Sequence, residues 1–414
     1  MKFGLSEQSM NVNTHIFLLS QYTEMDSAYW GLGSSSDGSI YFALCTHQPN
    51  KSAMVFAHNP TTGITQKLFS LADYISNADT FLPQGKVHTP IFEGSDGLLY
   101  FGTHFAYPHG KPQPVTYEGG HLVSYDHKNN SIHDLGIALA KDGILSLTMD
   151  KERMLLYMLT APSFHFIAYD IGHKIYKDYG QITQKGSICR SLTMDNNGNV
   201  YGSYEDNKIF RFDLSTATLE YPSVLLRAHG EKIREWEGAS RGGVNKIGRN
   251  IWRSALWNES TKLIYGIHGG TSKLFEFDPK SETIKELDFM GADINKNHPE
   301  MIYPTLSLAQ YKNMLFYTPD SGFFDYARSE KMKEHAHLVS YDILKFEQID
   351  RGEIIDASGR RVYGVAGSVM DLHGRYYLLG AVEVLKNEAY NRQNILQKKP
   401  FHLGLIEIDI NEYV

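Results

Sequence analysis

Short stretches in which hydrophobic and polar residues alternate run through the whole chain, and turns rich in Asp, Gly, Asn and Pro separate them. Alternation with a period of two predicts β-strands that bury one face. The turns have the composition that short hairpins need. The sequence therefore predicts an all-β protein.

A phrase made of a small or apolar run, a polar turn and an aromatic strand recurs along the chain. The copies are YWGLGSSSDGSIYFAL, HTPIFEGSDGLLYFGT, ILSLTMDKERMLLYMLT, CRSLTMDNNGNVYGSY, RSALWNESTKLIYGIH, YPTLSLAQYKNMLFYT and GVAGSVMDLHGRYYLLG. A second alternating phrase follows each copy, and the string HLVSYD stands at both His121 and His337. Because each phrase predicts one hairpin, each repeat unit predicts four antiparallel strands.

Seven units of this length predict a seven-bladed β-propeller with four-stranded antiparallel blades, formed by residues 1–414 as a single domain. The blades are expected at about 28–75, 86–138, 142–182, 187–225, 250–290, 302–350 and 362–414. The last copy ends soon after its third strand, so an N-terminal strand at 14–20 is expected to complete it and close the ring. Two separate β-sandwiches are the alternative, but they would not require seven copies of one paired phrase.

Strand direction sorts the polar loops onto two faces of the ring. The loop that enters the first strand of a blade emerges on the same face as the loop between the second and third strands. Loops of these two kinds carry Tyr29, Trp30, His47, His88, His104, Tyr107, His109, His121, Arg190, Arg253, His268, Tyr303 and Tyr363. A face rich in His, Tyr and Arg is suited to a polar, anionic ligand.

Charge and hydropathy indicate which classes of partner are not expected. The net charge of −7 gives no general attraction to phosphate backbones, which argues against nucleic acid. No apolar run is long enough to cross a membrane or to form a signal-peptide core, so neither a membrane nor a leader is expected. Cys45 and Cys189 are far apart and outside any CxxC motif. The sequence as written predicts a cytoplasmic protein, or a periplasmic or secreted one if a leader has been removed.

The segment from Lys86 to Asp126 contains His88, His104, His109 and His121. One interpretation is a site for a divalent metal such as zinc or calcium, because imidazole is a common metal ligand. A second is acid–base chemistry without a cofactor, because an ordinary histidine pKa near 6.5 suits proton transfer at neutral pH. A third is purely structural, with each imidazole bonded to its own hairpin loop. The sequence leaves all three open.

Two arginines enter consecutive blades on the same face. Arg190, in GSICRSLTMD, and Arg253, in NIWRSALW, could each hold a carboxylate in a bidentate fork, or pair with an acidic residue of a neighbouring blade. The glycines after His268 lie between two strands and do not open a helix, so a phosphate cradle is not indicated. The charged insertion at 225–250 borders this face, either as a lid or as a solvated loop.

At HTPIFEGSDGLLYFGTH, CRSLTMDNNGNVYG and YGIHGGTSKLFEFDP the sequence resembles the β-propeller polysaccharide lyases of the ulvan lyase and rhamnosyl-glucuronate lyase type, and the related propeller rhamnosidases. The resemblance implies cleavage of a bond 4-linked to a uronic acid by β-elimination, with a uronate-containing oligo- or polysaccharide as partner. It implies a base that takes the C5 proton, a cation that neutralises the carboxylate, and an unsaturated uronate product.

Carried over residue by residue, the resemblance implies proton transfer by His104 and His121 and carboxylate neutralisation by Arg190. Tyr363 is the candidate for the tyrosine of this chemistry, although it stands in no matching motif. The expected substrate-binding residues are His47, His88, His109, Arg253, His268 and Tyr303.

Two other functions stay open at this point. His47, in CTHQPNKSAM, is similar to the histidine of the propeller rhamnosidases, which implies hydrolysis that releases terminal rhamnose from glucuronate. A propeller that binds carbohydrate without catalysis is the other alternative, because a fold does not determine a function.

Overall fold

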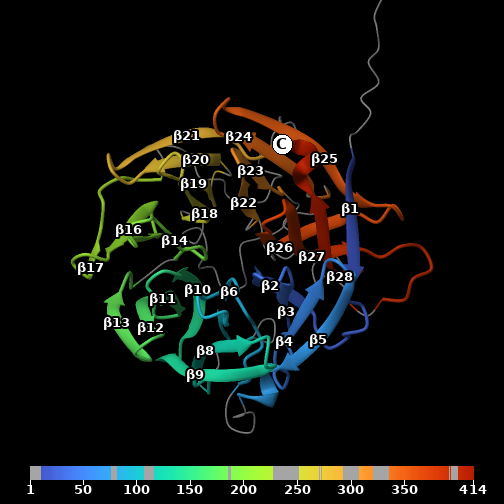
Figure 1. Cartoon of the computed structure of the whole chain (residues 1–414), viewed down its shortest axis with the longest axis horizontal. Helices are drawn as coiled ribbons and strands as arrows, with labels where there is room; N and C mark the ends of the chain where they lie inside the picture. The colour runs from blue at the N-terminus through green and yellow to red at the C-terminus, as the bar shows by residue number, and fades with distance from the viewer. Residues whose placement is uncertain are drawn as a thin grey trace, which may run out of the picture.

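The structure is a computed structural model that describes residues 11–75, 82–106, 116–184, 188–226, 251–269, 271, 273–291, 307–319, 335–390, 392 and 400–414. The strands form sheets that stand around a central axis, and each four-stranded sheet has its first strand innermost (Figure 1).

Five of the sheets in these ranges have four strands in sequence order, and each strand pairs antiparallel with the next. Their strands are β2 (Ser27–Ser34), β3 (Ile40–Cys45), β4 (Met54–Asn59) and β5 (Ile64–Ser70); β6 (Phe92–Glu93), β7 (Leu99–Gly102), β8 (Gly119–Asp126) and β9 (Ser131–Ala140); β10 (Gly143–Asp150), β11 (Leu155–Ala161), β12 (His165–Asp170) and β13 (Ile175–Gln181); β14 (Thr193–Met194), β15 (Val200–Tyr204), β16 (Lys208–Asp213) and β17 (Thr218–Glu220); β18 (Trp252–Asn258), β19 (Leu263–His268), β20 (Lys273–Asp278) and β21 (Thr283–Phe289).

The remaining strands form one eight-stranded sheet in the order β22-β23-β24-β25-β1-β28-β27-β26. Their bounds are β22 (Leu308–Tyr311), β23 (Met314–Tyr317), β24 (His337–Asp342), β25 (Glu347–Asp356), β1 (Asn11–Leu18), β28 (Phe401–Asp409), β27 (Arg375–Glu383) and β26 (Val362–Met370). Strand β1 joins the two halves, because its first part pairs parallel with β25 and its second part antiparallel with β28. Figure 1 shows β1, in blue, beside the red C-terminal strands.

The prediction of seven separate blades is therefore wrong. The described strands form five four-stranded blades and one eight-stranded sheet, because β1 continues the hydrogen bonding from β25 across to β28. The expected pairing of an N-terminal strand with the last repeat is confirmed, since residues 15–18 pair with 404–407. An all-β propeller with four-stranded antiparallel blades is also confirmed as the architecture.

The core lies between neighbouring sheets. Each repeat contributes a tyrosine from its second strand, and all of these are at most 4% exposed: Tyr41, Tyr100, Tyr157, Tyr201, Tyr265, Tyr317 and Tyr377. Some of their hydroxyls bond to an aspartate of the preceding turn, as Tyr100 does to Asp96 at 2.6 Å and Tyr201 to Asp195 at 3.0 Å. The recurrent aromatic position thus packs the blades together, and in these two repeats its polar atom is also satisfied.

Four innermost strands carry a β-bulge near the end where they begin. The register shifts lie between Ala28 and Leu32 in β2, between Ile144 and Ser146 in β10, between Trp252 and Ser254 in β18, and from Val362 to Gly364 in β26. A bulge leaves a residue out of the ladder and re-aims its side chain. The residues released in this way include Tyr29, Arg253 and Tyr363.

A His–Asp corner recurs between the third and fourth strands of three repeats. A histidine near the start of the third strand faces an aspartate that in turn accepts the N–H of a glycine two residues later, with that glycine at positive φ. The sets are His121, Asp134 and Gly136; His165, Asp178 and Gly180; and His337, Asp350 and Gly352. The positive φ explains why glycine occupies the third position.

An apolar cavity of about 600 Å³ lies among the innermost strands. Side chains of these strands and of the segments before them line it, among them Leu32, Ile91, Leu147, Leu192 and Leu256. Ser191 and Trp30, which border it, are sequence neighbours of Arg190 and Tyr29. Within the described ranges no helix is long and apolar enough to cross a membrane.

Candidate functional site

A chain of three hydrogen-bonded side chains stands at the start of the first repeat. The Tyr29 hydroxyl lies 3.1 Å from His47 Nε2, and His47 Nδ1 lies 2.8 Å from Asp26 Oδ1. Because a carboxylate can only accept, Nδ1 carries the proton and donates to Asp26, and Nε2 of the neutral ring accepts a hydrogen bond from the Tyr29 hydroxyl. Burial lowers the pKa of His47, which outweighs the opposing effect of Asp26 and keeps the ring neutral at pH 7. The bulge in β2 places Tyr29 in this position.

Two further imidazoles continue from Tyr29 into the next repeat. The Tyr29 and His88 ring centroids are 4.2 Å apart, and those of His88 and His104 are 5.0 Å apart. Both histidines are 7% exposed. His104 Nδ1 donates to the Phe105 carbonyl oxygen at 2.9 Å, which leaves the Nε2 lone pair available. A neutral imidazole with an available nitrogen lone pair can accept a proton.

Both imidazoles are uncharged at neutral pH. Burial lowers the pKa of His104 to about 3, with the nearby charges of Lys86 and Arg190 acting in the same direction. The pKa of His88 is lowered well below its ordinary value by burial, and then by His104, Arg190 and Lys86. An imidazole that stays neutral keeps its lone pair for proton abstraction over a wide pH range.

Lys86 and Arg190 supply positive charge to the same group of residues. The Lys86 ammonium lies 4.5 Å from the centroid of the Tyr29 ring. Arg190 is close enough to lower the pKa of Lys86, His88 and His104 through its charge. The structure thus brings together Tyr29, His47, Lys86, His88, His104 and Arg190, which we call the face cluster, with Asp26 behind His47.

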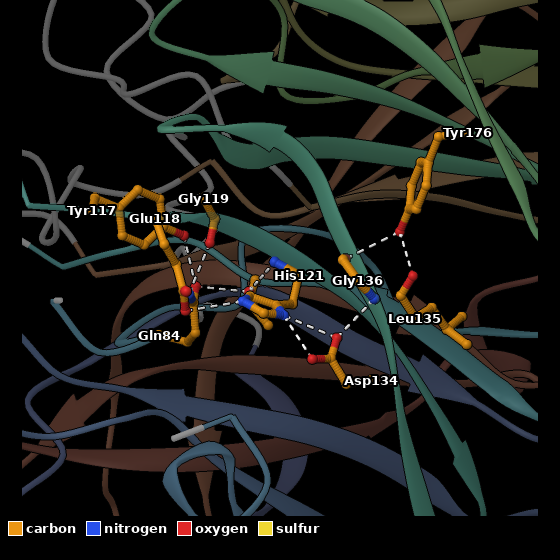
Figure 2. A network of polar contacts seen from close by, with 10 residues as sticks. Gln84, Tyr117, Glu118, Gly119, His121, Asp134, Leu135, Gly136 and Tyr176 are labelled. Carbon is orange, nitrogen blue, oxygen red and sulfur yellow. Dashed lines mark hydrogen bonds and ion pairs between the residues drawn. The ribbon is translucent and has the colours of Figure 1, made fainter. Parts of the chain in front are cut away.

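His121 has a different environment, shown in Figure 2. Its Nδ1 is 2.9 Å from both Asp134 carboxylate oxygens, and its Nε2 is 3.2 Å from Glu118 Oε1. Burial opposes the charged ring, but the two carboxylates outweigh it and raise the pKa of His121. With both ring nitrogens facing carboxylates, this imidazole lacks the free lone pair that a base needs.

Beside His121, a second network holds the loop that leads into β8. Gln84 donates to the Gly119 carbonyl oxygen at 2.9 Å and accepts from the Thr103 and Tyr117 hydroxyls at 2.8 and 2.6 Å. The His121 backbone N–H bonds to the Thr103 hydroxyl at 2.8 Å. Figure 2 shows Gln84 and Tyr117 on one side of His121 and Asp134 on the other. This network fixes the strand ends that carry His104 and His121.

The other sequence-predicted residues lie in the remaining repeats. His268 is 2% exposed and holds a loop, with Nε2 2.6 Å from Asn207 Oδ1 and Nδ1 accepting from the Thr271 N–H at 2.9 Å. Arg253 is the bulged residue of β18. Tyr363, bulged in β26, stacks on His335 with 5.5 Å between ring centroids, and burial raises the pKa of its hydroxyl.

Two predicted residues, His109 and Tyr303, lie outside the described residues, as do Tyr107 and most of the 225–250 insertion. In the part of the chain that the structure describes, no three or more His, Cys, Asp or Glu side chains are grouped so that they could hold a metal ion.

Sequence reasoning missed Asp26 and Lys86. Lys86 stands two residues before His88 in KVHTP, and its backbone pairs with that of His104 in an isolated bridge. A lysine before a strand is ordinarily an exposed residue, and no sequence pattern marks this one as buried. Asp26 stands immediately before the first strand of its repeat, in the same loop region as Tyr29, which the sequence assigned to this face. That position could have indicated that Asp26 lies near the site.

No known family profile and no curated protein matches the chain. Solved structures of β-propeller proteins do match it. A structure of streptogramin B lyase aligns with a TM-score of 0.58 at 12% identity, covering 97% of this chain and 100% of that one. YCF48 bound to D1 peptide aligns with a TM-score of 0.55 at 8% identity, covering 98% and 99%.

A third match is the extracellular domain of BT4673 from B. thetaiotaomicron, with a TM-score of 0.55 at 14% identity. It covers 98% of this chain and 43% of the other. Identities this low establish the β-propeller fold alone, and the functions of these proteins differ from one another.

Proposed function

We propose that the chain is a carbohydrate-active lyase that cleaves a glycosidic bond 4-linked to a uronic acid by β-elimination. The observation that carries the proposal is the face cluster itself: two neutral, buried imidazoles in ring contact, beside two cations and a hydrogen-bonded tyrosine. These are the three groups that elimination requires, namely a base, a positive site for the carboxylate and a proton donor.

In this mechanism His104 Nε2 removes the proton from C5 of the uronate. The electron pair of the C–H bond moves onto C5 and the adjacent carboxylate, where Arg190 stabilises the developing charge. The pair then forms the C4–C5 double bond, and the bond from C4 to the leaving oxygen breaks. Atoms and charges balance when the leaving oxygen receives one proton.

Tyr29 is the proton donor that the geometry favours. Its hydroxyl is held at 3.1 Å by His47, which Asp26 orients through the opposite ring nitrogen. For this step the phenol O–H turns from His47 Nε2 to the leaving oxygen and gives up its proton there. The Lys86 ammonium, 4.5 Å from the centroid of the Tyr29 ring, stabilises the phenolate that remains. Tyr29 therefore takes the role first considered for Tyr363.

The proposal leaves His121 out of proton transfer. Its imidazole ring lies between Asp134 and Glu118, so its role in this scheme is to fix the end of β8 next to the site. No cofactor is required by the scheme, because Arg190 supplies the positive charge that a metal ion would otherwise provide.

The test is an assay of the purified protein with ulvan, gum arabic and pectic fragments, followed by ultraviolet absorbance of the conjugated unsaturated product. We expect a rise in absorbance that Arg190→Met lowers by about 10²–10³-fold, the usual loss when a group that stabilises developing charge is removed. The matched control is Arg153→Met, whose side chain is 42% exposed and pairs with Asp150. Free rhamnose without absorbance would instead support hydrolysis at His47, and binding without product would support a lectin.

A further inference from the structure

Lys86 is a buried lysine held in a fixed backbone position. Its N–H donates to the His104 carbonyl oxygen and its carbonyl oxygen accepts from the His104 N–H, both at 2.8 Å. The residue is 8% exposed. The backbone bridge thus fixes the start of the lysine side chain beside His104, although lysine is among the residues least often buried without a partner.

The Lys86 ammonium has no anionic partner among the residues that the structure describes. The ion pairs of those residues join other side chains, including His47 with Asp26 and Lys51 with Glu24. The ammonium instead contacts the face of the Tyr29 ring, at 4.5 Å from the centroid. Lys86 Nζ is not among the buried polar atoms without a partner in the described residues, so the ammonium at the end of this largely buried side chain keeps some accessible surface. An anionic ligand bound there can pair with it.

The surroundings of Lys86 strengthen this interpretation. Among the described residues, Asp26 is the carboxylate whose charge raises the pKa of Lys86, and both of its oxygens are hydrogen-bonded to His47, at 2.8 Å to Nδ1 and 3.0 Å to the backbone N–H. Burial raises the pKa of the Cys45 thiol to about 12, so Cys45 is neutral.

The histidines facing Lys86 add no charge to the face cluster. His47, His88 and His104 all have lowered pKa values and are neutral at pH 7. Arg190 is the second cation, and its charge lowers the pKa of Lys86, whereas the charge of Asp26 raises it. The anion that pairs with the Lys86 ammonium is therefore not supplied by these histidines.

We infer that Lys86 is a ligand-binding residue whose ammonium pairs with the carboxylate of an acidic sugar bound beside Tyr29 and His88. This inference rests on the proposed function for the identity of the sugar and names the residue that selects a uronate over the neutral sugar. The Tyr29 ring beside the ammonium gives the same subsite an aromatic surface on which a sugar ring can pack. Lys86 thus sets specificity, whereas Arg190 stabilises charge during the reaction.

Anion binding at Lys86 is linked to protons. Burial lowers the pKa of free Lys86 to about 8, and a bound carboxylate favours the charged form and raises it. Below pH 7 the ammonium is charged in both states and no proton is exchanged. Above about pH 8 the free lysine is largely neutral, so binding takes up a proton and the affinity falls as the pH rises.

The experiment is isothermal titration of the full chain with D-glucuronate, and with D-glucose as the neutral probe, at pH 7 and pH 9 in two buffers that differ in ionisation enthalpy. We expect glucuronate to bind at least about 10-fold more weakly to Lys86→Met than to the wild type, and Lys86→Arg to recover part of the loss. The matched control is Lys51→Met, which changes a partly exposed lysine of the β3–β4 loop that pairs with Glu24. Glucose binding should be unchanged in all variants.

Wild-type measurements keep the inference falsifiable if Lys86→Met does not fold. Glucuronate affinity that is equal at pH 7 and pH 9, with no proton uptake, would overturn it, as would unchanged binding by a folded Lys86→Met. Glucuronate binding that depends on Lys86 in a protein that shows no elimination product would refute the proposed lyase activity and leave the anion subsite standing.

Discussion

At the scale of single residues, the decisive feature is that burial and charge determine which histidine can do which chemistry. His104 and His121 are both buried and are nearly equal in exposure, at 7% and 6%. His104 faces a carbonyl oxygen and two cations and stays neutral, whereas His121 faces two carboxylates and is stabilised as the cation. The same side chain is therefore held neutral in one position, whereas in the other its charged form is favoured.

His104→Asn is expected to lower kcat by about 10²–10⁴-fold, the usual contribution of a general base. The asparagine retains a donor for the Phe105 carbonyl oxygen, so the fold should persist. The measurement is the initial rate of unsaturated-product formation, together with thermal unfolding to verify the fold. His133→Asn, which changes an exposed histidine on β9, is the control and should keep full activity. Full activity in His104→Asn would refute the assignment of the base.

Much of the face cluster could be predicted from strand direction alone. His47, His88, His104 and Arg190 were all assigned to one face, and the structure brings them together. Asp26 and Lys86 were missed because their place in the face cluster depends on their burial and on their neighbours in space. The repeat pattern predicts neither property. Tyr29 was assigned to the same face, but its hydrogen bond to His47 could not be predicted, because it depends on the bulge in β2.

At the scale of the element, the His–Asp corner between third and fourth strands makes one blade sensitive to pH. In the folded protein the pKa of His121 is raised above the ordinary value near 6.5. Pairing of the charged ring with Asp134 therefore contributes its full stabilisation to the fold at pH values below about 6.5. The contribution is lost as the pH rises through the raised value.

Asp134→Asn should therefore lower the free energy of unfolding more at pH 5.5 than at pH 8.5. We expect a difference of about 1 kcal/mol, a modest value because Asp134 is partly exposed and solvent screens the pair. Urea unfolding at the two pH values measures it. Asp178→Asn in the next repeat is the control, since His165 is more exposed and the change should be smaller. An equal loss at both pH values would show that the pairing does not depend on the charge of His121.

The corner could have been found in the sequence, because the histidine, the aspartate and the glycine keep the same spacing in three repeats. The hydrogen bonds of the corner could not be predicted. The spacing alone does not show that the two strands pair in a register that brings the histidine and the aspartate within hydrogen-bond distance. Register depends on the bulges within these pairs, which the alternating pattern does not reveal.

At the scale of the whole molecule, the N-terminal strand decides how the ring is completed. The repeat phrases correctly predicted four-stranded antiparallel units, but they carry no information about what lies beyond the last strand of a unit. Strand β1 belongs to no repeat and pairs on both of its sides, which merges two expected blades into the eight-stranded sheet. Contacts between segments this distant in sequence leave no local signal.

Val12→Asp should destabilise the whole ring by about 3 kcal/mol or more, because Val12 is fully buried in β1 and a carboxylate there would be unpaired. Asn13→Asp, one residue further on the exposed side of the strand, should change the stability little. Thermal unfolding of both variants provides the comparison. A melting temperature for Val12→Asp equal to that of the control would mean that β1 contributes little to the stability of the ring.

The bulges of the innermost strands separate the side chains that they re-aim from the hydrogen bonding of the blades. Tyr29, Arg253 and Tyr363 are released from their ladders in three different strands, while the pairing on either side of each bulge continues. A residue outside the ladder can change without removing a hydrogen bond between strands. Substitutions at these three positions should therefore alter the chemistry at the ends of the innermost strands and leave the strand pairing of the blades intact.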